Sequence, residues 1–212
     1  PHGDFLHPSV SIGGGVNRID AERPSLLRQN ADLALYHAKE TRRGSCVFFE
    51  PTLRTSMMRQ METIRLVRDA LDDGRIINYY QPVVRIGEGT ICGLEVLARM
   101  RAADGTIVPA GEFLDAFSDR RLGAGLTRRI LGQAASDMAG WLAMGIAPER
   151  IAINLSGADF AEEGLDGQIA AVFDAHGVPL ERVTLEITET VVMESGGCRI
   201  ARAIKALSSR GF

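Results

Sequence analysis

A polar residue interrupts an apolar, β-rich run at residues 151–156, which reads Ile151-Ala152-Ile153-Asn154-Leu155-Ser156. Side chains alternate across a strand, so the large apolar residues share one face and Asn154 lies on the other. Two further runs place a carboxylate in the same setting: Gly93-Leu94-Glu95-Val96-Leu97-Ala98-Arg99 and Val183-Thr184-Leu185-Glu186-Ile187-Thr188-Glu189. If the apolar face of a sheet meets helices, Glu95, Asn154 and Glu186 turn towards a common enclosed side.

These three side chains carry oxygen donors that suit a hard cation. Carboxylate and amide oxygens favour Mg2+, Mn2+ or Ca2+ over zinc, which prefers His and Cys. An unpaired carboxylate is costly to bury, so a positive group must lie near Glu95 and Glu186. From the residues alone, internal arginine partners explain the two glutamates as well as a cation does, and Asn154 suits a cap of the following turn equally well.

Beyond Gly74, strand and helix patterns alternate along the chain. We expect strands near 76–84, 91–99, 150–156 and 182–188, and helices near 111–117, 124–143, 165–176 and 197–209. Alternation of this kind predicts parallel strands covered by helices. Asn154 and Glu186 are 32 residues apart, close to the roughly 31 residues per unit of an eight-repeat barrel of about 250 residues. The sequence therefore predicts an α/β fold with four strands of a partial (β/α)8 TIM-type barrel, ending at Phe212 as a fifth strand would begin.

The part before Gly74 has the pattern of a different α/β unit. A strand at 9–16 runs into a glycine turn, Pro24 opens a helix, and a short strand follows at 46–49. A longer helical pattern then extends over 52–73. We predict three parts: the end of an α/β domain at 1–50, a linker helix at 51–74, and half of a barrel at 75–212.

The composition is that of an ordinary globular protein. Of 212 residues, 45% are hydrophobic and 24% are charged, and the net charge of -3 provides no broad basic surface, which argues against polynucleotide binding. Three isolated cysteines indicate reduced thiols. Neither a signal peptide nor a membrane segment is visible. We expect a cytoplasmic location for this segment and leave open a membrane anchor upstream of it.

Taken together, the motifs resemble a tandem GGDEF-EAL protein of bacterial cyclic di-GMP signalling. The front is similar to the end of a GGDEF domain through Ala31-Asp32-Leu33-Ala34-Leu35-Tyr36-His37-Ala38-Lys39. The back resembles the first half of an EAL domain through Tyr79-Tyr80-Gln81-Pro82, Glu95-Val96-Leu97 with Arg99, Asn154-Leu155-Ser156 and Glu186-Ile187-Thr188-Glu189. The motifs follow one another at matching intervals.

The resemblance implies a cyclic di-GMP phosphodiesterase that cleaves one phosphodiester bond with Mg2+ or Mn2+ and releases linear pGpG. It implies metal ligation by Glu95, Asn154 and Glu186, phosphate binding by Arg99, and nucleotide contact by Gln81 and Leu97. Glu189 would position the loop after the next strand. It also implies cyclic di-GMP as the partner molecule and a homodimer through the EAL domain.

Some family features lie outside this sequence or depart from it. The GGDEF hairpin would precede Pro1, and a D-D-F-G strand, a catalytic lysine and a further glutamate would follow Phe212, so we expect the 212-residue chain alone to be inactive. The F-I-P-L-A-E segment is altered over 113–118. Lys39 and Arg43 match GGDEF nucleotide contacts, although a solvated helix end explains them too.

Other interpretations stay open for the barrel half. The complete protein could bind cyclic di-GMP without cleaving it, or serve as a scaffold held by internal salt bridges. Glu95 and Arg99 share a strand face about 13 Å apart at about 3.3 Å per residue, which favours a shared phosphate over a direct ion pair. Arg99 could instead extend to the rim, and Gln81 could satisfy a strand-end backbone group.

Overall fold

The computed structural model describes residues 9–17, 19, 23–41, 43–146, 148–161, 163–189, 191 and 197–212. The chain divides into two compact units, Pro1–Glu62 and Thr63–Phe212. Helix α2 (Pro51–Asp72) contributes to both units. Within the described residues, no helix is both long and apolar enough to cross a membrane.

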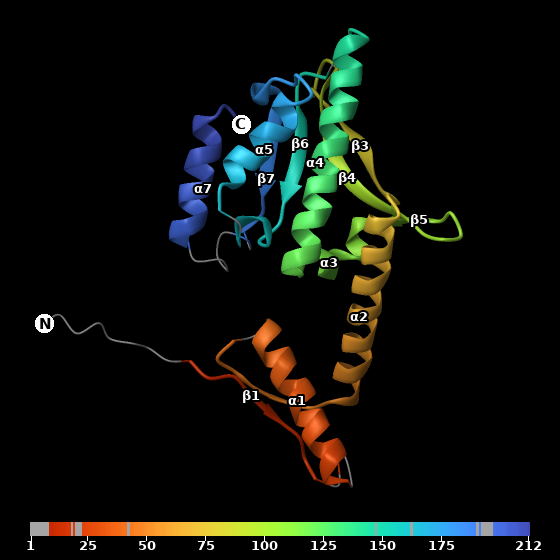
Figure 1. Ribbon diagram of the computed structural model, residues 1–212, viewed down its shortest axis with the longest axis vertical. Helices are drawn as coiled ribbons and strands as arrows, with labels where there is room; N and C mark the ends of the chain where they lie inside the picture. Colours follow the sequence, from red (N-terminus) through yellow and green to blue (C-terminus); the bar gives the residue numbers. More distant parts are fainter. Residues whose placement is uncertain are drawn as a thin grey trace, which may run out of the picture. The chain divides into compact units, whose positions relative to one another are not determined.

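The first unit is built from a pair of short strands and one helix. Strand β1 (Ile12–Gly14) pairs in parallel with β2 (Cys46–Phe48), and α1 (Pro24–Thr41) lies against β1 (Figure 1). The helix approaches so closely that a Cβ at Gly13 would lie 2.2 Å from the carbonyl oxygen of Ala31. Glycine at this position therefore lets α1 rest directly on the strand backbone.

The second unit contains a five-stranded mixed sheet. Its strands are β3 (Ile76–Val84), β4 (Ile91–Arg101), β5 (Ile107–Pro109), β6 (Ile151–Leu155) and β7 (Val183–Ile187). The order is β3-β4-β6-β7, with β5 beside β4. The β4–β6 and β6–β7 pairs are parallel, as the sequence pattern predicts.

Two strand pairs differ from the prediction of a parallel sheet. The β3–β4 and β4–β5 pairs are antiparallel. Only residues 85–90 connect β3 to β4, which suffices for a hairpin but not for the crossover of a dozen or more residues that a parallel pair needs. The prediction of four strands was also wrong, since the sheet has a fifth strand, β5. The sequence shows no sign of β5 because this strand has only three residues and shows no alternation of its own.

Helices cover one face of this sheet (Figure 1). They are α3 (Leu114–Ser118), α4 (Arg120–Ala143), α5 (Leu165–Asp174) and α7 (Gly197–Ser209), with short 3-10 turns at η1 (Ala110–Glu112), η2 (Asp159–Ala161) and η3 (Leu180–Arg182). The predicted helix near 111–117 is divided between η1 and α3 at Phe113. Helix α4 begins before the predicted residue 124 because the carboxylate of Asp119 caps it by accepting from the backbone N–H groups of Arg121 and Leu122.

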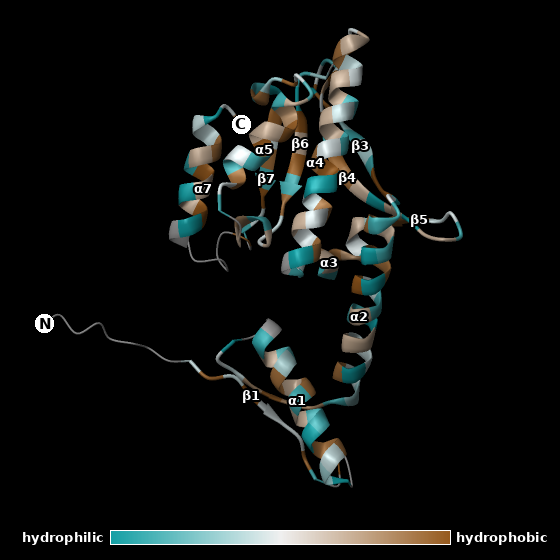
Figure 2. Cartoon of the chain, viewed as in Figure 1, coloured by the Kyte–Doolittle hydropathy of each residue, from teal (hydrophilic) through white to brown (hydrophobic). Residues whose placement is uncertain are grey.

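The core lies between the sheet and these helices. On β6, the side chains of Ile151, Ile153 and Leu155 are buried against it, whereas Asn154 between them is exposed. Figure 2 shows brown, apolar positions along the strands and the helices that cover them. The predicted assignment of faces is therefore confirmed for this strand, and the polar residues lie on the face away from α4 and α5.

Candidate functional site

Strand register brings the three predicted oxygen donors together. Asn154 on β6 is the direct partner of Glu186 on β7, and Glu95 on β4 is the partner of Ala152. The amide nitrogen of Asn154 donates to Oε1 of Glu95 over 3.1 Å. Because neighbouring strands lie about 4.8 Å apart, the Glu186 carboxylate projects from the adjoining strand at the level of Asn154.

The electrostatics of this cluster leave two carboxylates without a cationic side chain. None of the ion pairs formed by the described residues includes Glu95 or Glu186. Glu95 is half-buried, and Asn154 and Glu186 are exposed. The side predicted to be enclosed is thus open to solvent over the described part of the chain. Internal arginine partners, the alternative explanation for these glutamates, are not found there.

This donor set fits a hard divalent cation. It offers two carboxylates and the oxygen of an amide whose nitrogen is turned to Glu95. Among the described residues no group of three or more His, Cys, Asp or Glu side chains gathers at one point. That result agrees with the composition of this site, because its third member is an asparagine.

Gln81 adds a further polar side chain to the same row. It is the direct partner of Glu95 in the antiparallel β3–β4 pair, and it is exposed. Within the described residues its side chain makes no hydrogen bond to a strand-end backbone group, the role that competed with nucleotide contact. Its amide lies beside the oxygen cluster and can both donate and accept hydrogen bonds.

Arg99 is folded against its own sheet face. Its guanidinium carbon lies 5.6 Å from the centroid of the Tyr79 ring, and Nη1 donates to the carbonyl oxygen of Ala98 over 2.8 Å. No ion pair of the described residues includes Arg99. A half-buried cation on the same sheet face as the two carboxylates, and in no ion pair with them, is suited to hold an anion between itself and a metal ion bound at that cluster.

A cavity of about 650 Å³ opens at the carboxyl ends of β4 and β6. Residues at its wall include Leu97, Asn154, Ser156 and Thr188, with Leu114 and Phe117 from α3. This volume falls within the roughly 300–1,000 Å³ of small-molecule pockets. The segment 113–118, which departs from the family pattern, thus forms part of the wall next to the oxygen cluster.

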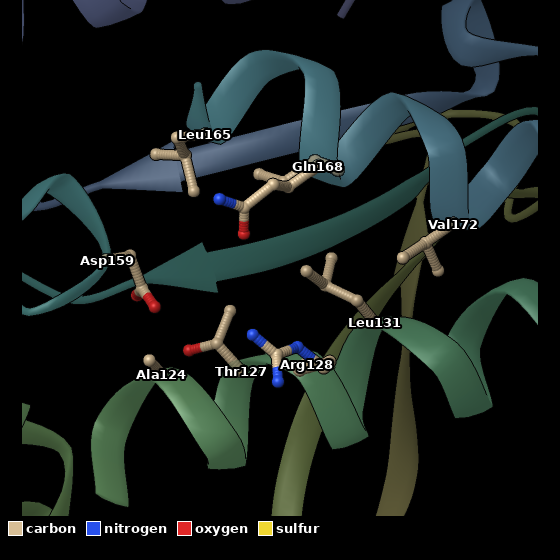
Figure 3. A pocket seen from close by; sticks show the side chains of 9 residues that line it. Ala124, Thr127, Arg128, Leu131, Asp159, Leu165, Gln168 and Val172 are labelled. Carbon is tan, nitrogen blue, oxygen red and sulfur yellow. The ribbon is translucent and has the colours of Figure 1, made fainter. Parts of the chain in front are cut away.

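A second cavity of about 50 Å³ lies between α4 and α5 (Figure 3). It has room for a few water molecules and not for a nucleotide. Buried Asp159 at its edge accepts hydrogen bonds from the backbone N–H of Ser156 at 2.7 Å and its hydroxyl at 2.8 Å. Asp159 therefore fixes the turn that follows Asn154, a role that sequence reasoning missed because the signal is a single acidic residue in a loop.

The remaining predicted residues are less tied to this site. Lys39 and Arg43 are exposed at the end of α1, where Nε of Arg43 donates to the carbonyl oxygen of Lys39 over 3.1 Å. That geometry suits a solvated helix end, where cations meet the negative end of the helix dipole. Glu189 is exposed just beyond β7.

Comparison with known proteins identifies relatives for this arrangement. A model of the EAL domain matches residues 64–212. The chain is 30% identical over 203 residues to the bifunctional diguanylate cyclase/cyclic di-GMP phosphodiesterase MucR of Pseudomonas aeruginosa, covering 96% of this chain and 30% of that protein. The chain thus spans about 30% of the length of this curated relative.

Solved structures show the same architecture. A structure described as the PaMucR phosphodiesterase in complex with c-di-GMP has a TM-score of 0.64 and 27% identity, covering 71% of this chain and 60% of that one. The S helix-GGDEF-EAL part of Vibrio cholerae LapD, bound to c-di-GMP, has a TM-score of 0.58 and covers 93% of this chain and 47% of that one. At 16% identity, the LapD likeness is one of fold.

Proposed function

The chain belongs to the EAL domain family, and on that basis we propose that it forms part of a cyclic di-GMP phosphodiesterase that yields linear pGpG with Mg2+ or Mn2+. One observation carries the proposal most directly: the 3.1 Å contact between Glu95 and Asn154, with Glu186 in register on the next strand. MucR, a relative of 30% identity, is a bifunctional diguanylate cyclase/cyclic di-GMP phosphodiesterase, which supports the same assignment.

In the proposed site the chain holds the ion and orients the substrate. The carboxylates of Glu95 and Glu186 and the amide oxygen of Asn154 bind the cation. When bound, the ion supplies Lewis acidity that activates water and offsets charge on the phosphoryl group. The guanidinium of Arg99 binds the phosphate through its planar fork of N–H donors.

The nucleotide side of the proposed site is assigned to β3 and the end of β4. Gln81 is proposed to hydrogen-bond a guanine edge, since its amide offers both donor and acceptor atoms. Leu97 lies at the wall of the large cavity beside Asn154. Glu189, just beyond β7, is proposed to position the loop after the next strand of the complete barrel.

We assign residues 1–50 to the end of a GGDEF domain, residues 51–74 to a linker helix and residues 75–212 to half of an EAL barrel. The parallel β1–β2 pair with α1 suits the end of an α/β domain. Lys39 and Arg43 then take the places of GGDEF nucleotide contacts.

We also propose a cytoplasmic location. The free thiols of Cys46 and Cys92 support it, because the cytoplasm is a reducing compartment. A homodimer through the EAL domain completes the proposal.

The test is turnover of cyclic di-GMP by the complete protein in Mn2+, followed by chromatography of pGpG. The wild-type protein is expected to form pGpG, and Glu95→Gln is expected to lose nearly all turnover. Binding of cyclic di-GMP without any pGpG, at saturating Mn2+, would replace the enzyme with a binding module. A protein that neither binds nor cleaves the nucleotide would leave only the scaffold.

A further inference from the structure

We propose that Tyr79 is a positioning residue for phosphate binding, whose ring face holds the Arg99 guanidinium in place. The assignment rests on the proposed function, because it gives Arg99 its phosphate. The basis is the 5.6 Å between the guanidinium carbon of Arg99 and the Tyr79 ring centroid, within the roughly 6 Å range of a cation–π contact.

The register of β3 and β4 brings Tyr79 and Arg99 close together on the sheet. Tyr79 on β3 pairs directly with Leu97 on β4, and Arg99 lies two residues further along the same face. Tyr79 and Arg99 are therefore diagonal neighbours, a separation that aromatic and long side chains bridge. Gln81 and Glu95 form the adjacent pair on this face, so Tyr79 belongs to the row that carries the site.

The surroundings of Arg99 explain why a ring suits this place better than a carboxylate. The guanidinium donates to the carbonyl oxygen of Ala98 and makes no ion pair with the described residues. A carboxylate partner would occupy the fork of N–H donors. The face of a ring takes up none of the N–H donors, so the donors that Ala98 does not use stay available for a phosphate.

Tyr79 lies outside the hydrophobic core, whereas the neighbouring tyrosine packs against it. Tyr80 points to the opposite face, where its hydroxyl donates to Asp137 and its ring meets Trp141 edge to face at 4.8 Å. Tyr79 is 47% exposed. Its large ring at a half-exposed position is accounted for by the cation that it holds.

Steady-state kinetics of the complete protein test this assignment. Tyr79→Leu is expected to raise KM for cyclic di-GMP by roughly 3- to 30-fold, the effect of losing a cation–π contact. Tyr79→Phe keeps the ring face and is expected to restore most of that loss. In an Arg99→Gln background, Tyr79→Leu should add less than about twofold, because coupled residues are not additive. Thermal unfolding of each variant checks that the fold is kept.

The outcomes separate this inference from the proposed function. Normal KM in a folded Tyr79→Leu protein, or an equal effect of Tyr79→Leu with and without Arg99, overturns the positioning role and leaves the phosphodiesterase intact. Failure of Tyr79→Phe to restore KM overturns it as well, since the hydroxyl and not the ring would then matter. A wild-type protein that neither binds nor cleaves cyclic di-GMP overturns both.

Discussion

The Asn154 amide nitrogen donates to Oε1 of Glu95 across 3.1 Å, although 59 residues separate the two in sequence. The contact exists because β4 and β6 pair in parallel with Glu95 beside Ala152, which places Asn154 one pleat further along the same face. An asparagine here satisfies one carboxylate oxygen without adding charge. The cluster thereby keeps a net charge of two carboxylates for a cation to neutralise.

Replacing this asparagine by aspartate tests the charge balance of the cluster. Asn154→Asp adds a third carboxylate and removes the hydrogen bond to Glu95, so in EDTA the free energy of unfolding should fall by up to about 1 kcal/mol. Mn2+ should recover this loss because the ion screens the added charge. Chemical denaturation with and without Mn2+ measures both. Destabilisation of the same size in either condition would show that no cation binds here.

Two glycines of helix α4 give a matched pair for its packing. A Cβ at Gly123 would lie 2.5 Å from the carbonyl oxygen of Phe117 and 3.1 Å from Cβ of Ala158, whereas a Cβ at Gly132 meets nothing within 4 Å. We expect Gly123→Ala to destabilise the protein by roughly 1–3 kcal/mol through overpacking. Gly132→Ala should stabilise it by about 0.5–1 kcal/mol through helix propensity.

Denaturant unfolding of the two alanine variants provides the comparison. Both substitutions add the same methyl group to the same helix. We expect the free energy of unfolding to change in opposite directions, because the methyl group meets Phe117 at position 123 and open space at position 132. Equal effects would mean that α3 and the turn after β6 do not press against α4 at Gly123.

The hydrogen bond from the Tyr80 hydroxyl on β3 to Asp137 on α4 is expected to be lost at alkaline pH. Burial, together with the hydrogen bond to Asp137, raises the pKa of Tyr80 well above its ordinary value of 10.0. Its contribution to stability is therefore fully present below pH 10 and is lost as the pH rises from there towards the folded-state pKa. Tyr80→Phe should lower the free energy of unfolding at neutral pH by roughly 1.5–3 kcal/mol.

The measurement for this hydrogen bond is the difference in the free energy of unfolding between wild-type protein and Tyr80→Phe at each pH. That difference should shrink above pH 10, since only the wild-type protein has this hydroxyl to ionise. A difference that stays constant from pH 7 to strongly alkaline pH would contradict the raised pKa.

The local patterns in the sequence predicted the faces of the strands correctly. Alternation places Asn154 on the face opposite to that of Ile153 and Leu155. This assignment needs no knowledge of the rest of the fold, because it depends only on strand geometry. The 32-residue spacing of Asn154 and Glu186 indicated one strand-helix unit between them. Their direct pairing across β6 and β7 is a matter of strand register, which the structure supplies.

The features that sequence reasoning missed depend on tertiary structure or on very short elements. The direction of β3 could have been read from the short connection at 85–90, which allows only a hairpin. Strand β5 and the cap at Asp119 are too short to produce a periodic pattern. The contact of the Arg99 guanidinium with the Tyr79 ring depends on the register of two strands, which no single stretch of sequence contains.

The end of the described chain is held to α5 by an acid-sensitive ion pair. Arg210 donates from Nε to Asp166 over 2.6 Å, and this hydrogen bond lowers the pKa of Asp166 below its ordinary value of 3.8. The stabilisation is present above pH 3.8 and is lost as the pH falls through the lowered pKa. Asp166→Asn should therefore show a flatter loss of thermal stability in acid than wild-type protein, and Asp174→Asn, at the other end of α5, should not. Parallel curves for all three would contradict the assignment.

Calorimetric titration of Mn2+ into the complete protein, without nucleotide, tests the central claim that Glu95, Asn154 and Glu186 share one divalent ion. We predict binding by the wild-type protein, with affinity reduced at least about tenfold, or 1.4 kcal/mol, in each of Glu95→Gln, Asn154→Ala and Glu186→Gln. Glu149→Gln, whose carboxylate pairs with Arg85 away from the cluster, should bind Mn2+ as the wild type does. Wild-type affinity in all three cluster variants, or no Mn2+ binding by any of the proteins, would contradict the claim.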